Sequence, residues 1–306
     1  MNILVLGASG QLGTCFMEYA KADKDNEYTA PSHSALDVTD PFEVEKAFAE
    51  IRPKIVLNFT AFNDVEGAEL VHEEYSESMN RYVPKMLGEL CKKYNALLVH
   101  ISTDYVYAPY EKWEGEPFDV APKGVRTRDF YNKYGKHKFY GEVEIAESRC
   151  RYIIIRTSWL YSKYGNNFVK KVLALCENGG EYTFPVDQIG TPTSAEHLAN
   201  HIFFDIVLKA NTKLIRRAGL LYNFSDYGAC SRYDFAEMVK EMFDLFKHYE
   251  SSAKILPCVS DDLTGYIAQR PYFSVMSSRE FDIFFPKSTA KTSWSEGVEE
   301  VVMELV

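Results

Sequence analysis

The chain begins with the strand-like run Asn2-Ile-Leu-Val-Leu6, followed directly by Gly7-Ala-Ser-Gly10-Gln-Leu-Gly13, and this stretch decides the fold class. A short apolar run that leads into a glycine turn and then an amphipathic helix is the start of a βαβ unit. Glycines let the backbone turn tightly and approach a pyrophosphate, whose charge the amide groups at the helix N-terminus can offset. The alternative interpretation is a strand-to-helix turn that binds nothing.

The same alternation of strand and helix continues through the first 160 residues. Further strands are predicted at 55–58, 97–102 and 152–156, with helices at 11–21, 41–51, 74–94 and 131–147. Strands that are apolar on both faces are typical of a parallel sheet covered by helices on both sides. The sequence therefore predicts an α/β protein with a Rossmann-like, doubly wound parallel sheet.

The order is less regular after residue 160. Helices are predicted at 194–209 and 231–247, a strand at 220–224, and a helix from near Asn167 that ends at Asn178-Gly-Gly180. We expect a dinucleotide-binding Rossmann domain at 1–160, to which segments at about 195–225 return. Residues 161–306 would form mainly a smaller, substrate-binding C-terminal lobe. The charged, Pro- and Gly-rich segment 109–128 predicts a surface loop.

Composition limits the partners of this chain of 306 residues. A formal net charge of −10 argues against nucleic-acid binding, which requires basic patches. No apolar run approaches the roughly 20 residues that span a bilayer, so no membrane association is predicted. The six cysteines lack the spacing of a zinc site or a disulfide framework, which favours a reducing, cytoplasmic location. No metal site is predicted.

Tyr134 and Lys138 lie four residues apart on a predicted helix, so their side chains share one face. A nearby ammonium favours the phenolate and should draw the pKa of the phenol towards neutrality. Ser102 and Thr103 end the predicted strand 97–102, at the edge where open α/β sheets bind ligands. Because strand residues alternate faces, only one hydroxyl should point usefully. The alternative role for this strand end is turn hydrogen bonding.

The segment Ala30-Pro-Ser-His33 should follow the second strand, where NAD-preferring enzymes usually place an acidic residue. Its missing carboxylate favours NADPH over NADH, with Ser32 and His33 as possible partners for the 2′-phosphate. Asp37 follows closely. Its role is either a turn or cap residue, or an adenine contact.

Gly7 to Gly13, Ser102-Thr-Asp-Tyr-Val-Tyr107 and Tyr134-Gly-Lys-His-Lys138 followed by Gly141-Glu142 together resemble the extended short-chain dehydrogenases/reductases. Further segments, in the same order across nearly the whole chain, make the sequence similar to the dTDP-4-dehydrorhamnose reductase family. They are Leu36-Asp-Val-Thr-Asp40, residues 58–69, Arg156-Thr-Ser-Trp-Leu-Tyr161, Gly165-Asn-Asn-Phe168, Asp187-Gln-Ile-Gly-Thr-Pro-Thr193, Ser231-Arg-Tyr-Asp-Phe235 and Arg270-Pro271.

The resemblance implies reduction of the C4 keto group of a dTDP-linked deoxysugar, dTDP-4-dehydro-L-rhamnose, by NADPH or NADH. It implies Thr103, Tyr134 and Lys138 as the catalytic set, with Tyr134 as proton donor, and Asp104 and Trp159 with Thr103 as substrate contacts. The implied cofactor contacts are Gly7, Gly10, Gln11, Leu12, Asp37, Val38, Ala61, Phe62, Tyr134 and Lys138. Some family members form metal-bridged dimers, so a homodimer is a possible assembly.

Two segments depart from the family pattern and leave the identity of the sugar open. Segment 58–69 carries Phe59, Phe62, Asn63 and Gly67 in place of a small-residue run with a lysine, and Asp129-Phe-Tyr-Asn-Lys133 replaces a Pro-Leu-Asn approach to the tyrosine. One alternative is therefore a reductase, epimerase or dehydratase of another nucleotide sugar. Dehydratases usually place an acidic pair after the threonine, whereas Tyr105 follows Asp104 here.

The other alternative is a non-catalytic regulatory subunit, such as the one that resembles this family and binds methionine adenosyltransferase. The intact Thr103, Tyr134 and Lys138 argue against it.

Overall fold

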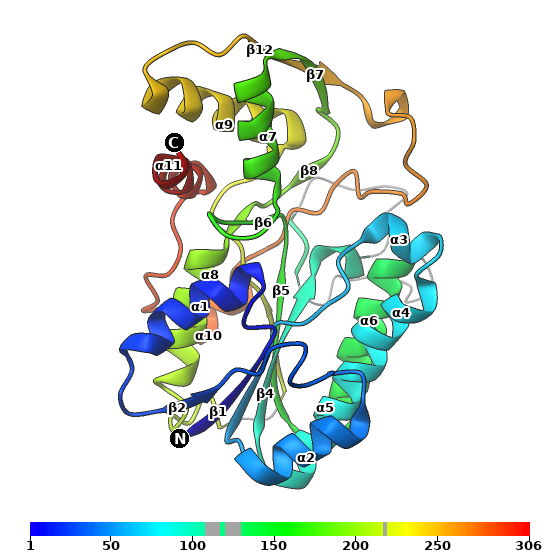
Figure 1. Ribbon diagram of the computed structural model, residues 1–306, viewed down its shortest axis with the longest axis vertical. Coiled ribbons are helices and arrows are strands. Elements are labelled where there is room, and N and C mark those ends of the chain that lie inside the picture. Colours follow the sequence, from blue (N-terminus) through cyan, green and yellow to red (C-terminus); the bar gives the residue numbers. More distant parts are fainter. Residues whose placement is uncertain (108–116, 120–129, 217–218) are drawn as a thin grey trace.

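A computed structural model describes residues 1–107, 117–119, 130–216 and 219–306, arranged as a sheet-containing lobe and a second lobe beside its strand ends (Figure 1). The main sheet has six parallel strands in the order β10-β5-β4-β3-β1-β2. The strands are β1 (Asn2–Leu6), β2 (Glu27–Thr29), β3 (Ile55–Asn58), β4 (Leu97–Thr103), β5 (Arg151–Thr157) and β10 (Leu220–Asn223). The predicted doubly wound parallel sheet is confirmed.

Helices cover both faces of the sheet because successive side chains of each strand point to opposite sides. Ile3 and Val5 of β1 pack against one helical layer, and Leu4 and Leu6 pack against the other. The first layer contains α1 (Gln11–Ala22), α8 (Ala195–His201) with its π-helical continuation Ile202–Val207, and α10 (Arg279–Phe284). The second layer contains α2 (Pro41–Ile51), α5 (Val83–Tyr94) and α6 (Lys133–Glu147).

Local capping sets several of these boundaries. The Asp40 side chain accepts hydrogen bonds from the backbone N–H groups of Phe42 and Glu43, and Pro41 occupies the first turn of α2. The predicted helix 74–94 is divided into α4 (Glu73–Glu77), a π-helical segment (Ser78–Tyr82) and α5. Pro84, which has no N–H to donate, lies where the π-helical segment gives way to α5.

The second lobe has its own core, formed by α7 (Phe168–Asn178), α9 (Arg232–Lys247), α11 (Trp294–Leu305) and the parallel pair β7 (Gly180–Pro185) and β12 (Ala253–Cys258). Short pairs lie between the lobes: β6 (Leu160–Tyr161) with β9 (Thr193–Ser194), and β8 (Ile189–Gly190) with β11 (Cys230–Ser231). The predicted loop 109–128 lies outside the described residues except for 117–119. None of the described helices has the length and apolarity that crossing a membrane requires.

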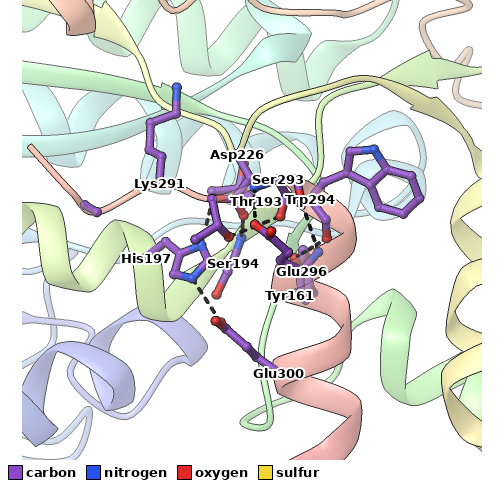
Figure 2. A network of polar contacts seen from close by, with 12 residues as sticks. Tyr161, Thr193, Ser194, His197, Asp226, Lys291, Ser293, Trp294, Glu296 and Glu300 are labelled. Atoms are coloured by element: carbon purple, nitrogen blue, oxygen red, sulfur yellow. Dashed lines mark hydrogen bonds and ion pairs between the residues drawn. The ribbon is translucent and has the colours of Figure 1, made fainter. Parts of the chain in front are cut away.

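A buried polar network fastens the last helix to the sheet-containing lobe (Figure 2). His197 of α8 lies with Nδ1 2.7 Å from an Asp226 carboxylate oxygen and Nε2 3.1 Å from Glu300 of α11. The other Asp226 oxygen accepts from the Ser194 backbone N–H at 2.8 Å. Burial by itself would lower the pKa of His197, but the hydrogen bond and charge of Asp226, with Glu300, raise it.

Candidate active site

A cleft of about 630 Å³ lies at the carboxyl ends of the strands of the main sheet. It brings together nearly all the residues singled out in the sequence: Gly7, Gly10, Gln11, Leu12, Asp37, Val38, Ala61, Thr103, Asp104, Tyr134, Lys138 and Trp159. Phe62 is not among the lining residues. Its ring packs edge-on against Tyr75 and His72, and its backbone is held by the Asn80 amide.

The glycine turn is shaped by backbone contacts that no side chain would fit. Gly7 has φ = 79°, and a Cβ there would lie 2.9 Å from the Phe59 carbonyl carbon. A Cβ on Gly13 would lie 2.2 Å from the Gly7 carbonyl oxygen, so α1 can approach β1 this closely only with glycine. The N-cap residue of α1 is Gly10, which has no side chain to cap the first-turn N–H groups. This end of the cleft therefore fits a dinucleotide pyrophosphate.

The far end of this cleft is formed by the segment after β2 and by Asp37. One Asp37 carboxylate oxygen accepts from the Thr39 N–H at 2.9 Å and from the Thr39 hydroxyl at 2.7 Å, and these bonds lower the pKa of Asp37. Asp37 thus forms a turn while also lining the cleft. His33 lines the same cleft, whereas Ser32 is directed to Ser34 at 3.0 Å.

The two hydroxyls at the end of β4 point in different directions, as the alternation of strand residues predicts. The Ser102 hydroxyl donates to Glu142 Oε1 at 2.5 Å, away from the tyrosine. The Thr103 hydroxyl donates to Asp104 Oδ1 at 3.0 Å, and its hydrogen bonding with Tyr134 acts to lower the pKa of that phenol. Thr103 is therefore the hydroxyl placed beside Tyr134.

The pKa shift of Tyr134 has the opposite direction to the one expected from the sequence. Burial raises its pKa well above the ordinary value, and hydrogen bonding with Thr103 offsets only part of that rise. The Lys138 Nζ donates to the Ile101 carbonyl oxygen, 2.6 Å away. Tyr134 is thus a neutral phenol at neutral pH, the form that can donate a proton.

Lys138 is itself buried, and this burial lowers its pKa to about 8, although the charge of Glu142 acts in the opposite direction. His100 lies behind it, with Nε2 3.5 Å from Lys138 Nζ and Nδ1 3.0 Å from the Asn58 amide nitrogen. Asn58 is oriented by the Thr60 N–H and hydroxyl, which both donate to its amide oxygen. Lys138 therefore has two partners on β4, Ile101 and His100, and Asn58 of β3 positions the second of them.

Arg232 is a site residue that sequence reasoning did not single out. Its guanidinium carbon lies 3.6 Å from the centre of the Trp159 ring, and it lines both the first cleft and a neighbouring cavity of about 1130 Å³. Burial lowers the pKa of Arg232, whereas Tyr105 and Asp104 raise it. Burial also raises the pKa of Asp104 to about 6. The signal was present in Ser231-Arg232, the start of a quoted motif, but nothing in the sequence placed that arginine against Trp159.

The second cavity adjoins the first through Asn63, Tyr105 and Arg232, which line both. Arg270 also lines the second cavity. Burial raises the pKa of the Tyr105 phenol, and the positive charges of Arg270 and Arg232 lower it. Arg270 Nη1 and Asp104 Oδ2 are buried and make no hydrogen bond within the part of the chain that the structure describes. The two cavities thus share part of their lining, and each is lined by a residue with a buried polar atom that lacks a hydrogen bond within the described residues.

A family model described as RmlD substrate binding domain matches residues 1–306. The chain belongs to this family. RmlD-family relatives include the spore coat polysaccharide biosynthesis protein SpsK of Bacillus subtilis (strain 168), which is 31% identical over 99% of this chain and 97% of that protein. The dTDP-4-dehydrorhamnose reductase of Escherichia coli (strain K12) is 30% identical over 100% and 98%. The family resemblance predicted from the motifs is confirmed.

Solved structures of RmlD-family relatives agree. The dTDP-4-dehydrorhamnose reductase of Clostridium acetobutylicum superposes with a TM-score of 0.85 at 30% identity, over 100% of this chain and 99% of that one. That of Bacillus anthracis, in complex with NADP, has a TM-score of 0.81 at 28% identity, over 99% and 98%. The fold of the RmlD family therefore extends over the whole of this chain.

Proposed function

We propose that this protein reduces the C4 keto group of dTDP-4-dehydro-L-rhamnose, giving dTDP-L-rhamnose, with NADPH or NADH as hydride donor. The observation that carries the proposal is the neutral Tyr134 phenol beside Thr103, in a cleft that begins at a glycine turn fitted to a pyrophosphate. Relatives named dTDP-4-dehydrorhamnose reductase over the full chain length support the same activity.

The nicotinamide, when bound, supplies the hydride. The glycine turn, from Gly7 to Leu12, would hold the pyrophosphate, and Asp37, Val38 and Ala61 would contact the adenosine side of the cleft. His33 lines that end and no carboxylate occupies the segment 30–33, which favours NADPH. Lys138 would hold the nicotinamide ribose. Phe62, directed to Tyr75, would act only through its backbone segment.

Three residues would take part in protonating the keto oxygen. Tyr134 would donate its phenolic proton to the oxygen as negative charge develops there, and Thr103 would hold that oxygen by a hydrogen bond. Lys138 would supply positive charge near the phenolate that remains. Because burial keeps Tyr134 protonated, the arrangement suits the reductive direction, in which the tyrosine must begin as an acid.

The charge of the site supports an anionic substrate. Arg232 and Arg270 approach each other closely enough that the charge of Arg270 lowers the pKa of Arg232, although burial is the larger cause. An anion that lay between them would relieve this repulsion, and the diphosphate of a dTDP-sugar has that chemistry. Trp159 and Asp104 would contact the sugar, while the second cavity would take the nucleotide.

This division of labour assigns residues 1–160 and the returning segment 195–225 to the cofactor, and 161–306 mainly to the substrate. The strand β10 and helix α8, both within the returning segment, pack on the main sheet, which supports that assignment. A homodimer and a cytoplasmic location stay predictions from the sequence.

The test is to mix the purified protein with NADPH or NADH and dTDP-4-dehydro-L-rhamnose and to follow the nicotinamide absorbance. Oxidation of the cofactor in step with the formation of dTDP-L-rhamnose is the expected result. Parallel reactions with UDP- and GDP-linked 4-keto-sugars test the choice of nucleotide. An absence of oxidation with the dTDP-sugar, under conditions in which the protein binds NADPH, would reject the proposal.

A further inference from the structure

The loop 263–270 of the second lobe is fastened to the sheet-containing lobe by one carboxylate. Glu66, on the short helix α3 (Val65–Glu69), accepts hydrogen bonds at Oε2 from the backbone N–H groups of Ile267 and Ala268, at 2.9 and 3.2 Å. Its Oε1 accepts from Arg270 Nη2 at 2.9 Å. One side chain thereby fixes both the path of the loop and the position of a guanidinium.

A second set of bonds joins the same loop and helix to the start of α6, the helix that carries Tyr134. The Asn132 side chain accepts from the Gly135 N–H at 2.9 Å, which caps α6, and donates to the Gln269 carbonyl oxygen at 2.8 Å. Glu69 of α3 accepts from the Lys133 N–H at 2.5 Å. The loop, α3 and the first turn of α6 are therefore one connected unit.

The orientation given to Arg270 leaves part of its guanidinium available. Nη2 is bound to Glu66, whereas Nη1 is buried and makes no hydrogen bond within the described residues. Burial raises the pKa of Tyr105, whereas the charge of Arg270 and its hydrogen bonding with this phenol lower it. Because Tyr105 lines both cavities, the guanidinium lies near the place where they adjoin. A planar guanidinium held on one edge presents the other edge to an oxyanion.

We propose that Glu66 is a positioning residue that docks the loop 263–270 over the second cavity and directs Arg270 towards the anionic, nucleotide end of the substrate. This inference rests on the proposed function, since it assumes a nucleotide diphosphate in that cavity. Glu66 belongs to segment 58–69, which departs from the family pattern.

The geometry of α3 accounts for one of those departures. Asp64 caps α3 by accepting from the Gly67 N–H at 2.9 Å. A Cβ at Gly67 would lie 2.4 Å from an Asp64 carboxylate oxygen, so a larger residue would require this capping side chain to shift. Gly67 thus fits the Asp64 cap of the helix that carries Glu66.

The experiment uses the full chain saturated with NADPH, and dTDP as the ligand. The variants are Glu66→Ala and the milder Glu66→Gln, which keeps an acceptor oxygen but loses the charge. Glu74→Ala is the matched control, because Glu74 is an exposed carboxylate on the adjacent helix α4. Calorimetry measures dTDP affinity, fluorescence measures NADPH affinity, and hydrogen exchange measures the protection of the Ile267 and Ala268 amides.

We expect Glu66→Ala to weaken dTDP binding by about tenfold or more, the loss typical of a hydrogen bond to a charged group. Glu66→Gln should fall between wild type and Glu66→Ala. NADPH affinity should stay within about twofold because the bonds of Glu66 go to the loop over the other cavity. Exchange of the Ile267 and Ala268 amides should become faster with Glu66→Ala. Glu74→Ala should change neither dTDP affinity nor the exchange of these amides.

A double-mutant cycle with Arg270→Ala tests whether Glu66 acts through that arginine. In the Arg270→Ala background, Glu66→Ala should weaken dTDP binding by less than about twofold, since the two losses are not independent. Fully additive losses would overturn the positioning role. Increased exchange with unchanged dTDP affinity would show a purely structural contact, and unchanged exchange would show that Glu66 does not hold the loop. Wild-type protein that fails to bind dTDP would reject the proposed substrate class instead, while the exchange data would still test the docking.

Discussion

Replacing Glu142 with glutamine should both destabilise the protein and shift its pH dependence. Glu142 Oε1 accepts from Ser102 at 2.5 Å and from Arg156 Nε at 2.9 Å, and Oε2 accepts from Arg156 Nη2 at 2.6 Å. Both side chains of the ion pair are only 6% exposed. Glu142→Gln removes the counter-charge that Glu142 supplies to the buried Arg156, at a cost of about 3–5 kcal/mol in the free energy of unfolding.

The matched control is Glu181→Gln, which breaks the Glu181–Lys254 pair. Those side chains are 62% and 66% exposed, and pairs of that kind contribute about 0–1 kcal/mol. Thermal unfolding should therefore show a fall in Tm of about 5–8 °C for Glu142→Gln and almost none for the control. A fall no larger than that of the control would refute the buried-pair account.

The same variant affects Lys138, which lies on the same face of α6. The negative charge of Glu142 raises the pKa of Lys138 against the larger lowering by burial, which leaves it at about 8. Without that charge, the pKa falls further and the ammonium is lost at a lower pH. The alkaline limb of the kcat/KM profile should move to lower pH, and a limb that stays in place would show that Lys138 does not control it.

Three other perturbations have defined outcomes. Gly13→Ala should lower the free energy of unfolding by about 1–3 kcal/mol and abolish measurable NADPH binding, because its Cβ would lie 2.2 Å from the Gly7 carbonyl oxygen. Gly10→Ala, whose Cβ would lie 3.3 Å from the same oxygen, should lower it by less, and equal losses would contradict this. His197→Gln should remove a pH dependence of Tm. Because folding raises the pKa of His197, this residue stabilises the folded protein below the unfolded pKa of about 6.5, and that stability is lost as the pH rises through the folded pKa. A wild-type Tm that rises between the unfolded and the folded pKa would contradict this prediction. Arg232→Ala should raise KM for the dTDP-sugar about tenfold with little change in NADPH affinity, and an unchanged KM would remove Arg232 from the substrate site.

Local signals explain which elements the sequence could predict. The helix 41–51 has the bounds predicted from the sequence because its signals are local. Asp40 and Pro41 mark its start, and Val44 and Phe48, four residues apart, form its buried face. The helix α11 was missed, although Ser293 and Glu296 form a capping box at its start and Val298, Val301 and Val302 are spaced for one buried face.

The candidate site was predictable where one motif supplies it, as with the glycine turn and the Tyr134–Lys138 pair. The direction of the Tyr134 pKa shift was not predictable, because its largest cause is burial, which depends on tertiary packing. Arg232 and Arg270 come from the second lobe, and only tertiary packing places them beside Tyr105. The docking of Phe62 away from the cleft likewise depends on Tyr75 and His72.

The most direct test of the central claim is the reduction rate of Tyr134→Phe with NADPH and dTDP-4-dehydro-L-rhamnose, beside Tyr140→Phe as control. Both variants remove one phenolic oxygen from α6, but Tyr140 lies outside the residues that line the cleft. Loss of the proton donor should lower kcat by about 10²–10⁴-fold for Tyr134→Phe while NADPH affinity stays nearly constant, and Tyr140→Phe should resemble wild type. A Tyr134→Phe variant that reduces the sugar at the wild-type rate would contradict the assignment of Tyr134 as the acid.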